Sequence, residues 1–355
     1  MRLAETIQLL KQLIVTESFS KQETETATIL EDYLREQGQS PFRIQNNVIC
    51  HMPLDPNKPN IVLNSHHDTV KVSEGWTKDP FGAEDNGKII YGLGSNDAGA
   101  PLVCLLHTYL DYSKIDSLPY NLIFIASAEE EISGKHGLEL ALTQLDFKPD
   151  LAIVGEPTSC AMATAEKGLM VIDAEAKGIA GHAANQWGDN AIYAALKDIH
   201  WIENSSIENE SPLLGKVKLT VTQIEAGYQH NIVPDTCKFV IDCRVTDAYS
   251  LESVLELLKV NCSSILTPRS IRLHPSTIAT DHPIVQKANS LNINCYGSNT
   301  LSDQVFFNCP SVKIGPGDTS RSHKADEYIT HSELQQGLET YTLLLQNLNI
   351  NKHNI

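Results

Sequence analysis

The chain has 355 residues, of which 41% are hydrophobic and 20% are charged, as is usual for a globular protein. This length exceeds one ordinary core, so two domains are expected. The formal net charge of -17 makes nucleic acid and an anionic membrane poor partners.

The N-terminus begins with apolar side chains at helical spacing, namely Leu3, Ile7, Leu10 and Ile14. Polar residues interrupt this run, so residues 1–15 are predicted to form an amphipathic helix and not a signal peptide. No uninterrupted apolar stretch of the sequence reaches the ~18–20 residues of a membrane span. The eight cysteines form no CxxC pair and most lie in apolar runs. They are interpreted as reduced core residues of a cytoplasmic protein, with a disulfide framework as the alternative.

Four short apolar runs are each followed at once by polar or glycine-rich segments. The runs are Ile61–Leu63, Leu122–Ala126, Leu151–Val154 and Val312–Ile314. Such runs, without alternation, are typical of strands buried on both faces of a mostly parallel sheet. Helical patterns lie between some of them, at Leu102–Leu110 and His136–Leu145. The pattern predicts a doubly wound α/β domain, whose ligand site gathers at the carboxyl ends of the strands.

The middle of the chain has a different pattern, with the order β-α-β-β-α-β. Its predicted elements are Leu169–Lys177, Ala191–Ile202, Lys216–Ile224, Cys237–Val245, Leu251–Val260 and Ser270–His274. This is the split βαβ, ferredoxin-like arrangement. We therefore expect residues 168–275 to form a smaller inserted domain. Residues 1–167 and 276–355 then form one discontinuous catalytic domain.

Two of the polar segments contain a histidine or an aspartate in a setting that suits a metal. An imidazole that binds a metal needs its other nitrogen held by an acceptor. Because residues i and i+2 of an extended segment point to the same side, His66 and Asp68 can face one site. A polar loop is the alternative. Asp97 lies among glycines just before a predicted helix, where it is either a site residue or a helix N-cap.

Three consecutive carboxylates, Glu129-Glu130-Glu131, follow the strand that ends near Ala126. They repel one another unless a positive group is near. A surface charge run is the alternative, but divalent cations would employ one neighbour as ligand and another as base. Glu156 also stands at a strand end, and His323 follows a glycine-rich loop. Oxygen and nitrogen donors without thiolates suggest zinc, manganese or cobalt rather than a cysteine-rich structural site.

These segments carry a family resemblance over essentially the whole chain. The chain resembles the acetylornithine deacetylase, succinyl-diaminopimelate desuccinylase and carboxypeptidase G family of metallohydrolases. The motifs are Ser65-His66-His67-Asp68-Thr69-Val70, Gly94-Ser95-Asn96-Asp97, Glu129-Glu130-Glu131, Gly155-Glu156-Pro157-Thr158, Gly181-His182-Ala183, Asn231-Ile232-Val233-Pro234 and Gly315-Pro316-Gly317-Asp318 through His323. The resemblance implies that the inserted domain is a lid that mediates homodimer formation.

The resemblance also implies two divalent metal ions that share one ligand. His66, Asp97 and Glu156 would hold the first ion. Asp97, Glu131 and His323 would hold the second, so that Asp97 bridges the pair. Zinc is the expected metal, with cobalt or manganese as alternatives.

The same resemblance assigns Glu130 as the general base and Asp68 as the partner of His66. The family usually has Asp-Glu-Glu where this chain has three glutamates. A shift of one residue, with Glu129 as base and Glu130 as ligand, is therefore the alternative. We favour the first register because Ala128 then aligns with the family's small residue before the acidic trio.

The inserted domain would contribute His182 to the oxyanion and Asn231 and Arg244 to the substrate carboxylate. Gln304 stands where some members have a basic residue, which affects substrate recognition. The motifs most resemble the acetylornithine deacetylase branch, so we expect deacylation of N-acetyl-ornithine, or of N-acyl-citrulline or another N-acyl-ornithine, within arginine biosynthesis. The alternatives are succinyl-diaminopimelate desuccinylase, a di- or aminopeptidase, and a non-enzymatic metal-binding homologue.

Overall fold

The structure is a computed structural model that describes residues 2–185, 188–205 and 207–352. Residue 1 and residues 353–355, at the ends of the expected catalytic domain, lie outside the described residues. The chain divides into two compact units. Unit 1 contains Met1–Thr164, Ile278–Tyr296 and Ser302–Ile355, and unit 2 contains Ala165–Thr277 and Gly297–Leu301. The segment expected as the inserted domain, residues 168–275, thus omits Gly297–Leu301, which belongs to unit 2.

The larger sheet has a parallel centre and antiparallel edges. Its strand order is β1-β2-β5-β3-β6-β16-β7-β14, and β15 also pairs with β7. These strands are β1 Phe42–Ile44, β2 Asn47–His51, β3 Asn60–His66, β5 Asn121–Ser127, β6 Leu151–Val154, β7 Met162–Glu166, β14 Ser276–Thr277, β15 Cys295–Ser298 and β16 Ser311–Lys313. The strands β5, β3, β6 and β16 run parallel, whereas β2 and β7 pair antiparallel with them. The predicted α/β fold with a mostly parallel central sheet is confirmed, but the antiparallel edges were not predicted.

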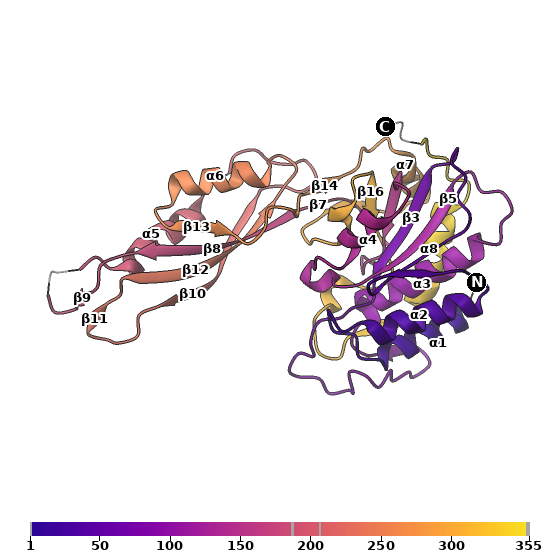
Figure 1. Cartoon of the computed structure of the whole chain (residues 1–355), viewed down its shortest axis with the longest axis horizontal. Coiled ribbons are helices and arrows are strands. Elements are labelled where there is room, and N and C mark those ends of the chain that lie inside the picture. The colour runs from indigo at the N-terminus through magenta and orange to yellow at the C-terminus, as the bar shows by residue number, and fades with distance from the viewer. Residues whose placement is uncertain (1, 186–187, 206, 353–355) are drawn as a thin grey trace. The chain divides into compact units, whose positions relative to one another are not determined.

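Helices cover both faces of this sheet. They are α1 Leu3–Ile14, α2 Thr24–Glu36, α3 Ala100–Tyr112, α4 Leu138–Gln144, α7 Pro283–Ser290 and α8 His331–Leu345. Ile61 and Leu63 of β3 pack in the cluster that contains α1, α2, α3 and α8, which Figure 1 shows beside β3 and β5. Val62, between them, packs with Leu138 of α4 on the other face. Because successive side chains of a strand point to opposite faces, a strand covered on both sides is apolar throughout.

A small two-stranded ladder and four short helical turns complete unit 1. The ladder joins β4 Ile89–Tyr91 to β17 Tyr328–Thr330 in antiparallel pairing. The turns are η1 Ser95–Gly99, η2 Glu130–Ile132, η3 Asp303–Phe306 and η4 Thr319–Arg321. Each of the four turns carries or adjoins a polar residue of the candidate site.

Unit 2 contains a four-stranded antiparallel sheet in the order β10-β12-β8-β13. Its elements in chain order are β8 Gly168–Lys177, β9 Gly181–His182, α5 Ala191–Asn204, β10 Lys218–Ala226, β11 Ile232–Val233, β12 Thr236–Val245, α6 Leu251–Asn261 and β13 Ile265–Pro268. The helices α5 and α6 pack on one face of the sheet. Phe239, Ile241 and Cys243 of β12 point into that core, as the alternating pattern predicted.

One element of unit 2 was predicted at the wrong place. The last strand was expected at Ser270–His274, but the strand that pairs with β8 is Ile265–Pro268, and the expected segment contributes a single antiparallel bridge to β8, between Leu273 and Leu169. Apolar residues alternate in Ser270–His274, whereas Ile265 and Leu266 are adjacent, so alternation favoured the later segment. In the structure each segment has one buried leucine, Leu266 or Leu273, and one exposed isoleucine. Burial therefore does not separate the two segments, and the longer pairing with β8 identifies Ile265–Pro268 as the strand.

The chain passes between the two units at paired strands. Glu166 of β7 lies opposite Ser276 of β14, and Ala165 lies opposite Thr277. Among the described residues, none of the helices is both long and apolar enough to cross a membrane.

Candidate metal centre

The parallel register of three strands gathers the polar residues of unit 1. His66 is the last residue of β3 and pairs with Ser127, the last residue of β5. Asn64 of β3 pairs with Val154, the last residue of β6. Because parallel strands end at the same edge, the residues that follow them meet there. Glu130 and Glu156 reach the site in this way.

His66 is buried and lies at the centre of the site. Its Nδ1 is 2.9 Å from the backbone carbonyl of Asp68 and donates to it, which leaves Nε2 unprotonated in the neutral imidazole. Nε2 has no hydrogen-bonded partner among the described residues and lies 3.3 Å from Asp97 Oδ1. It is also 3.8 Å from oxygens of Glu130 and Glu156. Burial alone lowers the pKa of His66, but the surrounding carboxylates raise it well above its ordinary value.

Asp97 lies between two histidines. Its Oδ1 faces His66 Nε2, and its Oδ2 is 3.6 Å from Nε2 of His323. Burial raises the pKa of Asp97, but the two imidazoles outweigh burial and lower it. A carboxylate with one oxygen directed at each histidine has the arrangement that a bridging ligand requires.

Glu131 and His323 form the other side of the site. His323 Nε2 is 2.9 Å from Glu131 Oε2, and this contact raises the pKa of His323 to about 9. Burial raises the pKa of Glu131 above its ordinary value, although His323 opposes the shift. A protonated imidazole supplies here the positive charge that one of the expected ions would supply.

Asp68 orients both halves of the site. Its carbonyl, not its carboxylate, is the nearer partner of His66, since Oδ1 is 3.6 Å from His66 Nδ1. The carboxylate instead accepts the backbone N–H groups of Glu130 at 3.0 Å and Glu131 at 3.2 Å. The hydroxyl of Ser20 donates to it as well, at 2.7 Å. Asp68 therefore joins the end of β3 to the turn of the glutamates.

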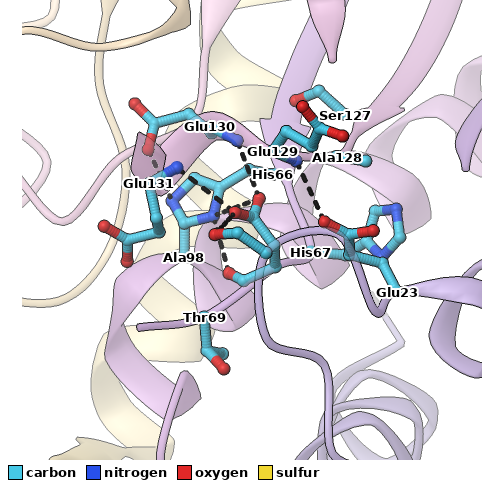
Figure 2. A network of polar contacts seen from close by, with 12 residues as sticks. Glu23, His66, His67, Thr69, Ala98, Ser127, Ala128, Glu129, Glu130 and Glu131 are labelled. Atoms are coloured by element: carbon cyan, nitrogen blue, oxygen red, sulfur yellow. Dashed lines mark hydrogen bonds and ion pairs between the residues drawn. The ribbon is translucent and has the colours of Figure 1, made fainter. Parts of the chain in front are cut away.

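Glu129 points away from this cluster. It adopts a left-handed backbone conformation, with φ of 56°. Its Oε2 accepts the N–H of His136, and its side chain lies against Gly134. Figure 2 shows Glu130 and Glu131 on one side of His66 and Glu129 on the other. This geometry favours the register in which Glu130 and Glu131 are the functional pair.

The donor set fits divalent cations. Among the described residues, two groups of side chains could each hold a metal ion, because the ligand atoms within each group lie within 4.8 Å of one another. One group is His66, Asp97 and Glu131, and the other is His66, Glu130 and Glu156. Burial raises the pKa of Glu156 to about 8 and that of Glu130 well above its ordinary value. Buried carboxylates with an unpaired imidazole nitrogen need positive charge in their midst. These groupings differ from the expected ligand sets, because Glu130 joins Glu156 and His323 belongs to neither group.

Two buried carboxylates beside the site were not singled out in the sequence analysis. Glu327 accepts the backbone N–H of Asn96 and of Asp97, and burial raises its pKa to about 8. Asp303 accepts the hydroxyl of Ser127 at 2.5 Å, and burial raises its pKa to about 7. Both occur next to motif residues, but nothing in their spacing distinguishes them from surface acids.

The remaining candidates lie in unit 2. His182 of β9 pairs with Ile232 of β11, which brings it next to Asn231. The N–H of Ala183 donates to the Asn231 carbonyl at 2.9 Å. Arg244 lies apart from them on β12, on the face opposite the helices. Its guanidinium donates two hydrogen bonds to the Asp242 carboxylate, at 2.8 and 3.1 Å.

Comparison with known proteins identifies the family. The model of the family described as peptidase family M20/M25/M40 matches residues 62–347. The chain belongs to this family. It is therefore a hydrolase of linear amide bonds, as the sequence predicted, and the resemblance read from the motifs is confirmed.

Members of the M20/M25/M40 family with different substrates are similarly related to the chain. The succinyl-diaminopimelate desuccinylase of Rickettsia bellii is 26% identical, with 96% of each chain covered. The acetylornithine deacetylase of Edwardsiella ictaluri is 28% identical, with 81% of this chain and 79% of the relative covered.

Solved structures share the fold at low identity. The metallo-carboxypeptidase Sso-CP2 of Sulfolobus solfataricus has a TM-score of 0.78 at 18% identity, covering 96% of this chain and 98% of its own. The YXEP protein of Bacillus subtilis, named a dinuclear metal-binding peptidase, has a TM-score of 0.73 at 15% identity, covering 98% of each chain.

The three glutamates can be told apart by single substitutions. Glu130→Ala should retain metal and lower kcat by about 10²- to 10⁴-fold, the usual contribution of a general base. Glu131→Ala should lose metal, because it removes an expected ligand. Glu129→Gln is the matched control, since its amide oxygen can still accept the N–H of His136, and it should keep both properties. Metal content by atomic absorption and initial rates check all three. Loss of metal in Glu130→Ala with loss of turnover in Glu129→Gln would select the shifted register.

Proposed function

We propose that the chain is a di-metal amidohydrolase that removes an acyl group from the α-nitrogen of an amino acid. The observation that carries this proposal is the position of Asp97, with one carboxylate oxygen facing His66 and the other facing His323. His66, Asp97 and Glu156 would hold one ion, and Asp97, Glu131 and His323 the other. Zinc is the proposed metal, with cobalt or manganese as alternatives. When bound, the ions would lower the pKa of water and polarise the substrate carbonyl.

Glu130 performs the proton transfers in this proposal. It accepts a proton from the attacking water as the C–O bond forms. It then gives that proton to the departing nitrogen as the C–N bond breaks. Its backbone N–H donates to Asp68, and its half-buried carboxylate lies 3.8 Å from His66 Nε2.

His182 would donate to the oxygen of the tetrahedral intermediate. Its Nδ1 accepts the N–H of Ala184 at 3.1 Å. The neutral ring therefore carries its proton on Nε2, which is the donor that such a contact needs. Asn231 and Arg244 would bind the substrate carboxylate, Asn231 through its amide nitrogen and Arg244 through its guanidinium.

Two substrates are supported by the relatives. N-acetyl-ornithine, or a related N-acyl-ornithine or N-acyl-citrulline of arginine biosynthesis, follows from the motifs and from the 28% identical deacetylase. N-succinyl-diaminopimelate follows equally from the 26% identical desuccinylase, whose match covers more of the chain. Both are N-acyl amino acids with a free α-carboxylate, so the chemistry of the site is the same for each.

A panel of N-acyl amino acids tests the proposal. Protein that is treated with a chelator should release no free amine, and added Zn²⁺, Co²⁺ or Mn²⁺ should restore release. The panel contains the acetyl and succinyl derivatives of ornithine, citrulline and diaminopimelate, and two dipeptides. The highest kcat/KM identifies the substrate. Equal activity with and without metal would contradict a metal-dependent mechanism, and activity on the dipeptides alone would favour a peptidase.

Arg244→Ala should lower kcat/KM for the best substrate. Loss of a charge-assisted contact of this kind costs about 2–5 kcal/mol, which is roughly 30-fold or more at 1.4 kcal/mol per decade. Arg269→Ala is the matched control, because Arg269 also pairs with an aspartate of the same sheet, Asp173. The methyl ester of the substrate should show the same loss with the wild type. If the ester and the acid are cleaved equally, Arg244 does not bind the carboxylate.

We further propose a cytoplasmic homodimer that forms through unit 2, with His182 serving the partner's site. All eight cysteines are free thiols, which supports a reducing compartment. The strand β10 is an edge of its sheet and is available for pairing across a two-fold axis. Inactive His182→Ala and inactive Glu130→Ala chains, refolded together, should regain activity if sites are shared. Mixed dimers without activity would place His182 in its own chain's site or in none.

A further inference from the structure

Glu327 is a buried carboxylate next to the candidate metal centre, and the proposed mechanism does not use it. Only 2% of its surface is exposed. It directly precedes β17, in which Tyr328 pairs with Tyr91 at the end of β4. The N–H of Gly92, the residue after β4, donates to the Glu327 carbonyl at 3.0 Å. The ladder therefore places Glu327 at the start of the turn that leads to Asp97.

The side chain of Glu327 holds this turn by its backbone. Its Oε1 accepts the N–H of Asn96 at 2.8 Å and the N–H of Asp97 at 2.9 Å. Asn96 is buried, so its N–H would lack a water partner if this oxygen were removed. The contact thus fixes the direction in which the chain enters Asp97.

That direction matters because Asp97 must face two histidines at once. The segment that ends in Glu327 also contains His323, whose Nε2 is 3.6 Å from Asp97 Oδ2. One segment therefore holds Asp97 from two sides, through its backbone and through its carboxylate. The amide of Asn96 adds a second link, since its Oδ1 accepts the N–H of Asp318 at 2.9 Å.

We propose that Glu327 is a positioning residue that orients the Asp97 carboxylate and thereby sets the affinity of the site for its metal ions. The inference rests on the proposed role of Asp97 as a shared ligand. It assigns to Glu327 no contact with metal or substrate. What the site needs from Glu327 is an acceptor oxygen at the position of Oε1, not its negative charge.

Three substitutions test this distinction in the full chain. Glu327→Ala removes the acceptor and should lower the affinity for Zn²⁺ by about 10- to 100-fold, the usual effect of losing a group that orients ligands. Glu327→Gln keeps an oxygen at the same reach and should bind Zn²⁺ like the wild type. Glu327→Asp keeps the charge but shortens the side chain, so it should bind more weakly than Glu327→Gln. Calorimetric titration of chelator-treated protein with zinc chloride measures all three.

Asp198 provides a matched control for loss of a buried acceptor. It lies on α5 in unit 2, is 4% exposed, and accepts the N–H of Ser263 at 3.0 Å and of Ser264 at 2.8 Å. Asp198→Ala should lower the thermal midpoint of the metal-free protein without changing Zn²⁺ affinity.

The outcomes separate this inference from the proposed function. If the wild type does not bind two zinc ions per chain, the proposed di-metal function fails. If it binds them and Glu327→Ala does so with equal affinity, the role of Glu327 is overturned. Should Glu327→Ala be insoluble, the order of the other two variants decides, because weaker binding by Glu327→Gln than by Glu327→Asp would show that charge, not acceptor position, is required.

Discussion

Repulsion among buried carboxylates is the constraint on which the rest of the site depends. Asp97, Glu130, Glu131 and Glu156 converge on the single imidazole of His66. In a poorly solvated space, like charges at such separations raise one another's pKa unless cations lie between them. Burial raises the pKa of the three glutamates, and only Asp97, which lies between two imidazoles, has a lowered pKa. Metal ions that bound at the proposed site would displace protons from these groups, and their affinity would therefore rise with pH.

The fold withstands this repulsion through its backbone. The parallel ladder of β3, β5 and β6 brings the strand ends together at no cost to the core, since the apolar side chains alternate between two covered faces. Two further carboxylates then hold the loops by their N–H groups. Asp68 binds the turn of Glu130 and Glu131, and Glu327 binds the turn of Asp97. Asp68 and Glu327 thus hold the loops of the site in place, and backbone N–H groups donate the hydrogen bonds that their buried carboxylates need.

The sequence predicted what is periodic and what is carried by motifs. The apolar runs located β3, β5, β6 and β16, and the motifs selected residues of unit 1 that the structure brings together. Prediction from the sequence failed where contacts between distant segments decide which residues pair. Ser270–His274 alternates as a strand should, yet the ladder with β8 is formed by Ile265–Pro268, and Ser270–His274 adds one bridge at Leu273. The proposed role of Glu327 depends on a ladder between residues that are more than two hundred positions apart, which no local pattern contains. Likewise, the partner of His66 is the carbonyl of Asp68, and carbonyls are not visible in side-chain motifs.

The pairing of β7 with β14 has a consequence for the architecture of the gene product. Glu166 and Ser276 lie opposite each other in an antiparallel ladder, and directly opposed residues of such a ladder have Cα atoms about 5 Å apart. A tight turn of two residues spans that gap. The chain therefore leaves the larger sheet after Glu166 and returns to it at Ser276, two positions that lie side by side. A chain with a two-residue turn in place of residues 167–275 would therefore keep the register of every strand in the parallel sheet.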